Sequence, residues 1–185
     1  MNQTADLTEK TLSREEKYQG SFLSLHVDQV QLPNGRTSFR EVVEHVDGVA
    51  ILALDDRNNV LTVTQYRYVI GKTLLEIPAG KLDAKDEDHL LAAQRELREE
   101  TGATAERWTS LGLFYPACAY SDEAIEMYLA QGLHFGERHL DADEFLNVAR
   151  VPLTELVQEV MAGHIPDAKT QIAILKADRL LNGAQ

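Results

Sequence analysis

The segment that most constrains the fold is a run of consecutive apolar residues, Val49-Ala-Ile-Leu-Ala-Leu54. A short run of this kind, bounded by polar residues, is typical of a buried strand. Asp55 to Asn59 reads as a turn, and Val60 to Tyr66 reads as the next strand because of its β-branched residues. As the longest clear apolar run, the first segment is far shorter than the ~18 residues of a membrane span. We therefore expect a globular protein without a membrane partner.

The first third of the chain is predicted to be mostly β. Apolar and polar residues alternate from Leu23 to Leu32, and Asn34-Gly35 is a strong two-residue hairpin signal before a returning strand over Ser38 to Glu44. The stretch from Met1 to Gly20 is polar, so it lacks the apolar region of a secretory signal.

The rest of the chain mixes both kinds of element. Leu90, Ala93 and Leu97 recur at helical spacing, and Gly102 is a plausible helix end. Strands are expected over 74–77 and around 108–114, 124–129 and 145–151, and helices over 153–161 and 168–181. This order predicts an α+β fold, with helices packed on the faces of a mixed sheet.

Length, net charge and cysteine content limit the functions that the chain can have. A chain of 185 residues with 44% apolar residues fits one domain with one core. The formal net charge of -12 argues against nucleic acid or an anionic membrane as a partner, because phosphate backbones are bound mainly through Lys and Arg. The single cysteine, Cys118, excludes an intrachain disulfide and fits a reducing compartment, so we expect a cytoplasmic protein.

The predicted helix carries a set of carboxylates. Glu96 and Glu100 lie one turn apart, with Glu99 nearby, and like charges at this spacing repel. A hard cation would reverse the sign of that interaction, and Mg²⁺ prefers such oxygen ligands together with substrate phosphates. The ordinary alternative is a solvated acidic face whose glutamates pair with Arg95 and Arg98. Spacing alone leaves both interpretations open.

A longer motif decides between them. From Gly80 the chain reads Gly-Lys-Leu-Asp-Ala-Lys-Asp-Glu87, then seven residues, then Arg95-Glu-Leu-Arg-Glu-Glu-Thr-Gly-Ala103. This closely resembles the box of the Nudix hydrolase family. Six residues separate Gly80 from Glu87 where the family pattern has five, so the loop before the helix holds one extra residue.

The resemblance implies a divalent metal site with Mg²⁺ as cofactor and Mn²⁺ as a substitute. Its ligands would be Glu96 and Glu100, with Glu99 and the carbonyl of Ala79. Arg95 would orient the glutamates by ion pairing, and Glu87 would complete the network, although an acid at a helix start can also simply complement the helix dipole. The metal ions would neutralise a diphosphate and activate a water.

The same resemblance implies a Nudix αβα sandwich with an N-terminal antiparallel β region. We expect residues 1–45 to form that region, within the same unit as a hydrolase domain over 46–185. By analogy with the sugar-nucleotide branch of the family, the N-terminal region would cross to a partner subunit and form a homodimer.

Segments outside the box resemble the ADP-ribose pyrophosphatase branch. Leu74-Leu-Glu-Ile-Pro-Ala-Gly80 and Gln65-Tyr66-Arg67 match its approach to the box and its strand. Arg67 and Glu76 would line the substrate site, Arg40 would supply another cation, and Phe22 and Tyr66 could stack on a nucleobase. Each of these residues also has an ordinary interpretation. A strand arginine is often a surface charge, Glu76 could simply pair with a nearby base, and the aromatic rings could serve in ordinary packing.

Two further segments bear on specificity and catalysis. In Phe114 to Glu123, Cys118-Ala119 stands where that branch usually has Pro-Gly, so GDP-mannose or a broad set of nucleotide sugars stays open as substrate. Cys118 itself is expected to be a packed thiol, not a nucleophile. The segment Leu140 to Phe145 resembles an acidic loop of these enzymes, and the resemblance implies that Glu144 is a metal ligand or the general base. Glu99 is the competing candidate for the base, and the alternative for Glu144 is an ordinary solvated turn.

The sequence therefore predicts a Mg²⁺-dependent enzyme that hydrolyses the pyrophosphate of nucleoside diphosphate sugars. ADP-ribose would be the preferred substrate and would give AMP and ribose 5-phosphate. A non-catalytic Nudix ligand sensor is disfavoured because Arg95, Glu96, Glu99 and Glu100 are all present. A calcium-binding acidic module is disfavoured because the EF-hand loop pattern is missing from the sequence.

Overall fold

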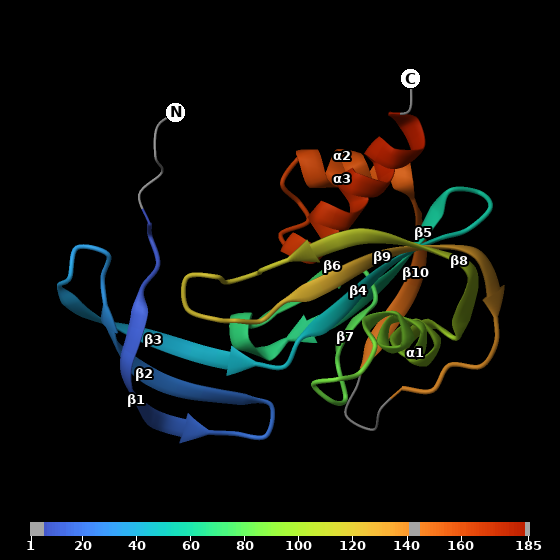
Figure 1. Cartoon of the computed structure of the whole chain (residues 1–185). Coiled ribbons are helices and arrows are strands. Elements are labelled where there is room, and N and C mark those ends of the chain that lie inside the picture. The colour runs from blue at the N-terminus through green and yellow to red at the C-terminus, as the bar shows by residue number, and fades with distance from the viewer. Residues whose placement is uncertain (1–5, 141–144, 184–185) are drawn as a thin grey trace. The chain divides into compact units, whose positions relative to one another are not determined.

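The computed structural model describes residues 6–140 and 145–183 (Figure 1). The chain divides into two compact units. The first unit runs as far as Val46 and includes Ala117–Glu123, and the second comprises Asp47–Pro116 and the chain from Ala124 onward. No helix in the described part is both long and apolar enough to cross a membrane.

The first unit is a three-stranded antiparallel sheet of β1 (Lys10–Gln19), β2 (Leu23–Gln31) and β3 (Thr37–His45), in that order. The predicted hairpin is confirmed, but its loop is longer than two residues: it runs from Leu32 to Arg36, and Leu32 N–H donates to the carbonyl of Arg36 (2.8 Å). Strand β1 was missed from the sequence. All of its residues are exposed, so it has no apolar face to give a period-two pattern.

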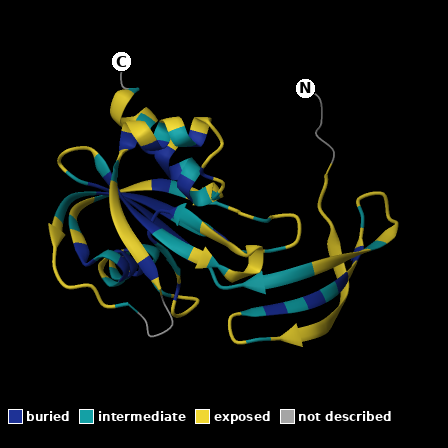
Figure 2. Ribbon diagram, turned by 180° about the vertical axis from the view of Figure 1, so that it is seen from behind, coloured by how far each residue is buried: buried dark blue, intermediate teal, exposed yellow. Residues whose placement is uncertain are grey.

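The central strand of this sheet has an inverted burial pattern. Ser24, His26 and Asp28 on one face of β2 are buried, whereas the apolar Leu25 and Val27 on the other face are only half-buried (Figure 2). Imidazole Nδ1 of His26 lies 3.0 Å from Asp28, and Arg14 donates to Asp28 through Nε (2.9 Å). Asp28 is thus paired within the sheet, whereas Nε2 of His26 has no hydrogen-bond partner among the described residues and lies 3.3 Å from the carboxylate of Glu44. The apolar face is the more open one.

A segment distant in sequence completes the first unit. Val43 N–H donates to the carbonyl of Tyr120 (2.7 Å), and His45 N–H donates to the carboxylate of Asp122 (2.8 Å). A single bridge between Val43 and Ser121 continues the pairing in the parallel sense. These bonds hold 117–123 against β3 although more than half of the second unit's chain lies between them in sequence.

The second unit contains a seven-stranded mixed sheet. Its main order is β10-β5-β4-β9-β8, with β6 paired to β5 and β7 paired to β4, and the β4–β9 pair is parallel. The strand bounds are β4 (Gly48–Leu54), β5 (Asn59–Arg67), β6 (Lys72–Glu76), β7 (Ala79–Lys81), β8 (Ala103–Phe114), β9 (Ile125–Phe135) and β10 (Leu146–Pro152), and a 3₁₀ turn, η1 (Tyr68–Ile70), joins β5 to β6.

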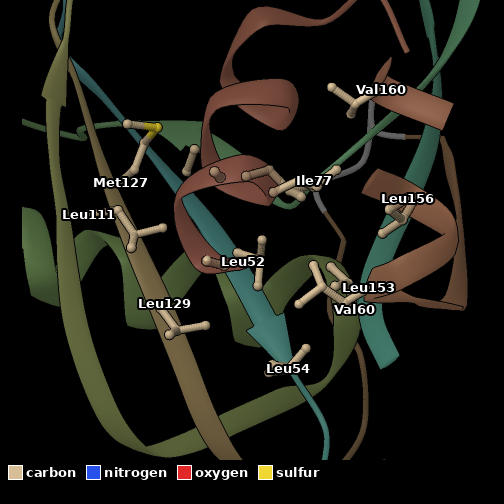
Figure 3. Close-up of a cluster of buried hydrophobic side chains, with 14 of the residues drawn as sticks. Leu52, Leu54, Val60, Ile77, Leu111, Met127, Leu129, Leu153, Leu156 and Val160 are labelled. Carbon is tan, nitrogen blue, oxygen red and sulfur yellow. The ribbon is translucent and has the colours of Figure 1, made fainter. Parts of the chain in front are cut away.

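Helices cover both faces of this sheet, so the predicted αβα arrangement is confirmed. α1 (His89–Thr101) lies on one face, and α2 (Leu153–Met161) and α3 (Ala168–Asn182) lie on the other (Figure 1). Leu52, Leu54 and Val60 belong with Leu156 of α2 to one cluster of buried apolar side chains on the α2–α3 side (Figure 3). Every residue of β4 is buried because the strand has helices on both sides.

We predict that Leu52→Ala lowers the free energy of unfolding by about 2–5 kcal/mol, because removing this buried side chain leaves a cavity in the apolar core. Leu52 is 0% exposed. Urea unfolding followed by circular dichroism measures the change. Leu180→Ala on α3, where the side chain is 54% exposed, serves as control and should change stability by less than about 0.5 kcal/mol. Equal effects of the two substitutions would contradict the placement of the core.

Candidate active site

Helix α1 has well-defined ends. The carboxylate of Asp88 accepts from the N–H groups of Leu90 (2.9 Å) and Leu91 (3.0 Å), which caps the N-terminus. At the other end Gly102 has a φ of 71°, and a Cβ there would lie 2.6 Å from the carbonyl oxygen of Gly136. Glycine is therefore required at this C-terminal stop, as predicted. The caps fix where α1 begins and ends.

The buried face of α1 includes two carboxylates. Alongside Ala93 and Leu97, it carries Glu96 at 7% exposure and Glu100 at 3%. Glu100 accepts a hydrogen bond from the backbone N–H of Ala79 (3.2 Å) in β7. Two negative groups one turn apart and mostly withdrawn from water are costly unless donors or cations compensate them. This pair is therefore the place where a cation would be stabilised most.

Gly80 gives Glu96 the space it occupies. The pairing of β7 with β4 sets Gly80 opposite Val49, and at this position a Cβ would lie 2.0 Å from the carboxyl carbon of Glu96. Real Cβ atoms do not come so close to another heavy atom. Only glycine lets the strand backbone approach the carboxylate in this way.

Arg95 connects the acidic side chains to one another. Its Nη1 donates to Glu96 (2.7 Å) and Glu99 (3.2 Å), and its Nη2 donates to the carbonyl of Lys81 (3.1 Å). Nε and Nη2 each lie 3.4 Å from Glu87. One guanidinium thus connects Lys81 at the start of the loop, Glu87 near the end of the loop and the carboxylates of the helix.

These contacts shift the pKa values of both partners. Although partial burial works against its charge, the hydrogen bond to Glu87 and the negative charge of Glu96 raise the pKa of Arg95 above its usual value. The backbone N–H of Asp83, which donates to Glu87 (2.7 Å), lowers the pKa of Glu87, and Arg95 lowers it further. Both groups keep their charges at neutral pH.

The loop between Gly80 and α1 accommodates its extra residue in a turn. Leu82 is buried, and its N–H donates to the carbonyl of Asp47 (2.9 Å). Glu87 N–H donates to the carbonyl of Ala84 (3.1 Å), so the added length is taken up in an exposed turn over 83–86. The helix and Glu87 therefore keep their contact with Arg95.

A second ionic cluster lies at the end of β6. Arg67 makes a bidentate contact with Glu76 through Nε (2.7 Å) and Nη2 (2.6 Å), and Lys169 of α3 also donates to Glu76. Glu76 is 1% exposed. Burial raises the pKa of Glu76, but the hydrogen bond from Arg67 and the charge of Lys169 outweigh it and leave the pKa below its usual value.

Family comparisons agree with this geometry. The model of the NUDIX domain matches residues 44–171, and that of the nucleoside diphosphate sugar hydrolase N-terminal domain matches 9–43. The chain belongs to the Nudix family. An ADP-ribose pyrophosphatase of Bacillus subtilis (strain 168) is 42% identical over 91% of this chain and 91% of its own. One of Mycobacterium tuberculosis (strain ATCC 25618 / H37Rv) is 38% identical over 94% and 85%.

A solved structure supports the fold. The crystal structure of ADP compounds hydrolase superposes with a TM-score of 0.84 at 22% identity, and it covers 97% of this chain and 98% of that chain. At this identity the likeness shows the Nudix fold alone.

Nudix hydrolases generally depend on divalent metals, and the residues of α1 fit such an ion in part. Glu96 and Glu100 provide hard oxygen ligands, and Gly80 leaves room for the carboxylate of Glu96 beside the strand backbone. Among the described residues, no group of three His, Cys, Asp or Glu side chains is arranged to hold a metal ion. A hard ion here would draw further oxygens from backbone, water or substrate phosphate, which is the usual arrangement for Mg²⁺.

The other residues predicted for the Nudix site are distributed more widely. Tyr66 lies next to Arg67 on β5 and is 58% exposed. In the first unit, Arg40 pairs with Glu9, and Phe22 meets His45 edge-on with ring centroids 5.6 Å apart. Glu144, predicted as base or ligand, lies outside the described residues.

One expectation is wrong and one set of residues was missed. Cys118 is exposed, not packed, because its segment runs along the surface of the first unit. Lys169, together with Asp167 and Thr170, was not singled out in the sequence. The only local signal is that Asp167 can cap a helix starting after Pro166, which says nothing of the contact with Glu76.

We predict that Gly80→Ala weakens Mg²⁺ binding by about 10–100-fold, the range seen when a ligand loses its support, because the added Cβ displaces the carboxylate of Glu96. Isothermal titration with Mg²⁺ measures the affinity. Gly136→Ala is the matched control, since its Cβ would meet nothing closer than the carbonyl oxygen of Gly102 at 3.7 Å. Wild-type Mg²⁺ affinity in folded Gly80→Ala would refute the role of this close contact.

Proposed function

We propose that this protein is a Mg²⁺-dependent hydrolase of nucleoside diphosphate sugars that prefers ADP-ribose and releases AMP and ribose 5-phosphate. The observation that carries the proposal is the buried Glu96–Glu100 pair held against the backbone of Gly80 and Ala79. The two relatives named ADP-ribose pyrophosphatase, which match nearly the whole chain, support the choice of substrate.

The chain's own residues divide the work of this reaction. Bound at Glu96 and Glu100, with Glu99 and the carbonyl of Ala79 as further ligands, Mg²⁺ or Mn²⁺ would neutralise the diphosphate and favour deprotonation of the attacking water. Arg95 and Glu87 hold the carboxylates in place. Glu144 or Glu99 would accept the proton of that water, and Arg67 and Arg40 would bind anionic parts of the substrate. Phe22 and Tyr66 would stack on the base.

We predict that Glu100→Gln abolishes most turnover with Mg²⁺. The amide can still accept from Ala79 N–H, so the fold should persist, but the charge that binds the ion is lost. The decrease in kcat/KM should be larger than the roughly 10–100-fold decrease that follows when a residue supporting a metal ligand is removed, because Glu100 is itself proposed as a ligand. Chromatographic measurement of AMP release from ADP-ribose gives kcat/KM, with the exposed Glu155→Gln as control. Undiminished turnover in Glu100→Gln would rule out the assigned metal role.

Substrate preference is tested by product analysis across a panel of nucleoside diphosphate sugars with Mg²⁺ and with Mn²⁺. We expect the highest kcat/KM for ADP-ribose, AMP and ribose 5-phosphate as products, and no turnover with chelator. Cleavage of no member of the panel would overturn the proposal as a whole.

GDP-mannose is the second candidate substrate. The exposed Cys118-Ala119 pair alters a loop that the ADP-ribose branch usually builds with Pro-Gly. A GDP-mannose pyrophosphatase of Yersinia enterocolitica is also related, though more distantly, at 32% identity over 71% of this chain. A kcat/KM for GDP-mannose above that for ADP-ribose would favour this candidate.

We also propose a cytoplasmic homodimer in which residues 1–45 provide the contact and 46–185 form the hydrolase domain. The inverted burial of β2 supports this, since Leu25, Val27 and Val43 share a face that is only half-buried, and Phe39 on that face is 65% exposed. Apolar surface of this kind is usually covered by a partner.

We predict that sedimentation velocity gives about twice the mass of the 20.7 kDa chain, as expected for a closed twofold dimer. Phe39→Glu should shift the protein towards monomer by placing a charge on the open apolar face. Glu155→Gln, at an exposed position of α2 in the second unit, is the control and should leave the mass unchanged. A wild-type monomer would contradict the proposed dimer without touching the hydrolase assignment.

A further inference from the structure

The ionic cluster at the end of β6 contains more cations than Glu76 needs for a simple pair. A buried carboxylate must be paired and hydrogen-bonded to remain charged. Arg67 alone already fills both oxygens of Glu76 in a bidentate contact. Lys169, whose side chain is 11% exposed, adds a second positive charge to the same oxygen that Nη2 of Arg67 contacts. The arrangement therefore constrains the orientation of Glu76 more tightly than Arg67 alone would.

Lys169 is itself fixed by the first turn of α3. Asp167 accepts from Nζ of Lys169 (2.9 Å) with one oxygen, and from the N–H (3.0 Å) and hydroxyl (2.5 Å) of Thr170 with the other. The hydroxyl oxygen of Thr170 accepts from the backbone N–H of Ile77 (3.0 Å). The start of α3 thus holds two successive residues of β6 and its extension, Glu76 by its side chain and Ile77 by its backbone.

The segment held in this way leads directly to the acidic helix. Ala79, two residues after Ile77, donates its N–H to Glu100. The hydrogen bond to Glu76 raises the pKa of Arg67 against the effect of burial, and the negative charges of Glu76, Asp167 and Glu100 add to this. Within the described part of the chain, Nη1 of Arg67 has no hydrogen-bond partner, and the side chain is 41% exposed.

We propose that Lys169 is a positioning residue that, by holding the Glu76 carboxylate in one orientation, aims the guanidinium of Arg67 at an anionic group of the substrate. This inference rests on the proposed function, because it needs a nucleoside diphosphate beside Arg67. Terminal carboxylate torsions are broad and soft, so a carboxylate with a single partner can rotate and take the planar fork of that partner with it. With Lys169 and Thr170 anchored on Asp167, the rotation is blocked.

The first test compares two lysines of the same helix. Lys169→Met should raise KM for ADP-ribose about tenfold, the size of one charge-assisted hydrogen bond, while kcat stays within about twofold. Lys176→Met is the matched control and should leave KM unchanged, because within the described residues Lys176 donates to the carbonyl of Leu111 and not to Glu76. Mg²⁺ affinity, measured by titration without substrate, should be the same in both variants.

Two further variants separate positioning from general support of the fold. Lys169→Arg restores a cation to Glu76 and should recover most of the lost affinity for substrate. In an Arg67→Lys background, Lys169→Met should add less than about twofold to KM, because residues that act through one another are not additive. If Lys169→Met does not fold, Lys169→Gln, which keeps a neutral donor, replaces it in the same comparisons.

The outcomes test the role of Lys169 separately from the proposed hydrolase function. Suppose that the wild type is active. The role of Lys169 is then overturned, and the hydrolase function kept, if Lys169→Met has the same KM as Lys176→Met, if it lowers kcat instead of raising KM, or if its effect adds to that of Arg67→Lys. A wild type that hydrolyses no nucleoside diphosphate sugar would overturn both.

Discussion

Two like charges held close together at the edge of the protein interior are the constraint on which the rest of the second unit depends. Glu96 and Glu100 would repel each other and prefer water, yet both are buried on α1. They stay in place because β4 pairs with β7, so that Gly80 and Ala79 meet the carboxylates with backbone only. The caps of α1 and the guanidinium of Arg95 then fix the rotation of the helix and the direction of its acids.

A chain with a net charge of -12 that acts on a polyanion must gather positive charge locally. In the second unit this is done with charges balanced in pairs. Arg95 is surrounded by the acids it orients. Arg67 and Lys169 share Glu76, and Lys169 also pairs with Asp167, so each cluster is tightly bonded before a ligand arrives. Side chains that are held beforehand lose little entropy on binding, which favours positioning over bulk attraction.

Elements with a strong local pattern were predicted well, and the exceptions have identifiable causes. The alternation in β2, the apolar run of β4, and the helical spacing and final Gly102 of α1 are local signals, and all three elements formed as expected. β1 has no buried face and thus no pattern, and β7 is too short to have one. Cys118 is exposed because its segment is hydrogen-bonded to Val43 of β3. The residues near Cys118 in sequence do not predict this contact.

By itself, the sequence determined the chemistry: the acids of α1, the arginine that joins them and the glycines around them are set by residue type and spacing along one loop and helix. Tertiary structure alone decided which distant residues complete that chemistry. Lys169 and Thr170 reach Glu76 and Ile77 across 93 positions of sequence, because α3 packs on the sheet that carries β6. Spacing can report contacts within one helix turn or strand pair, whereas contacts between elements depend on how the whole core packs.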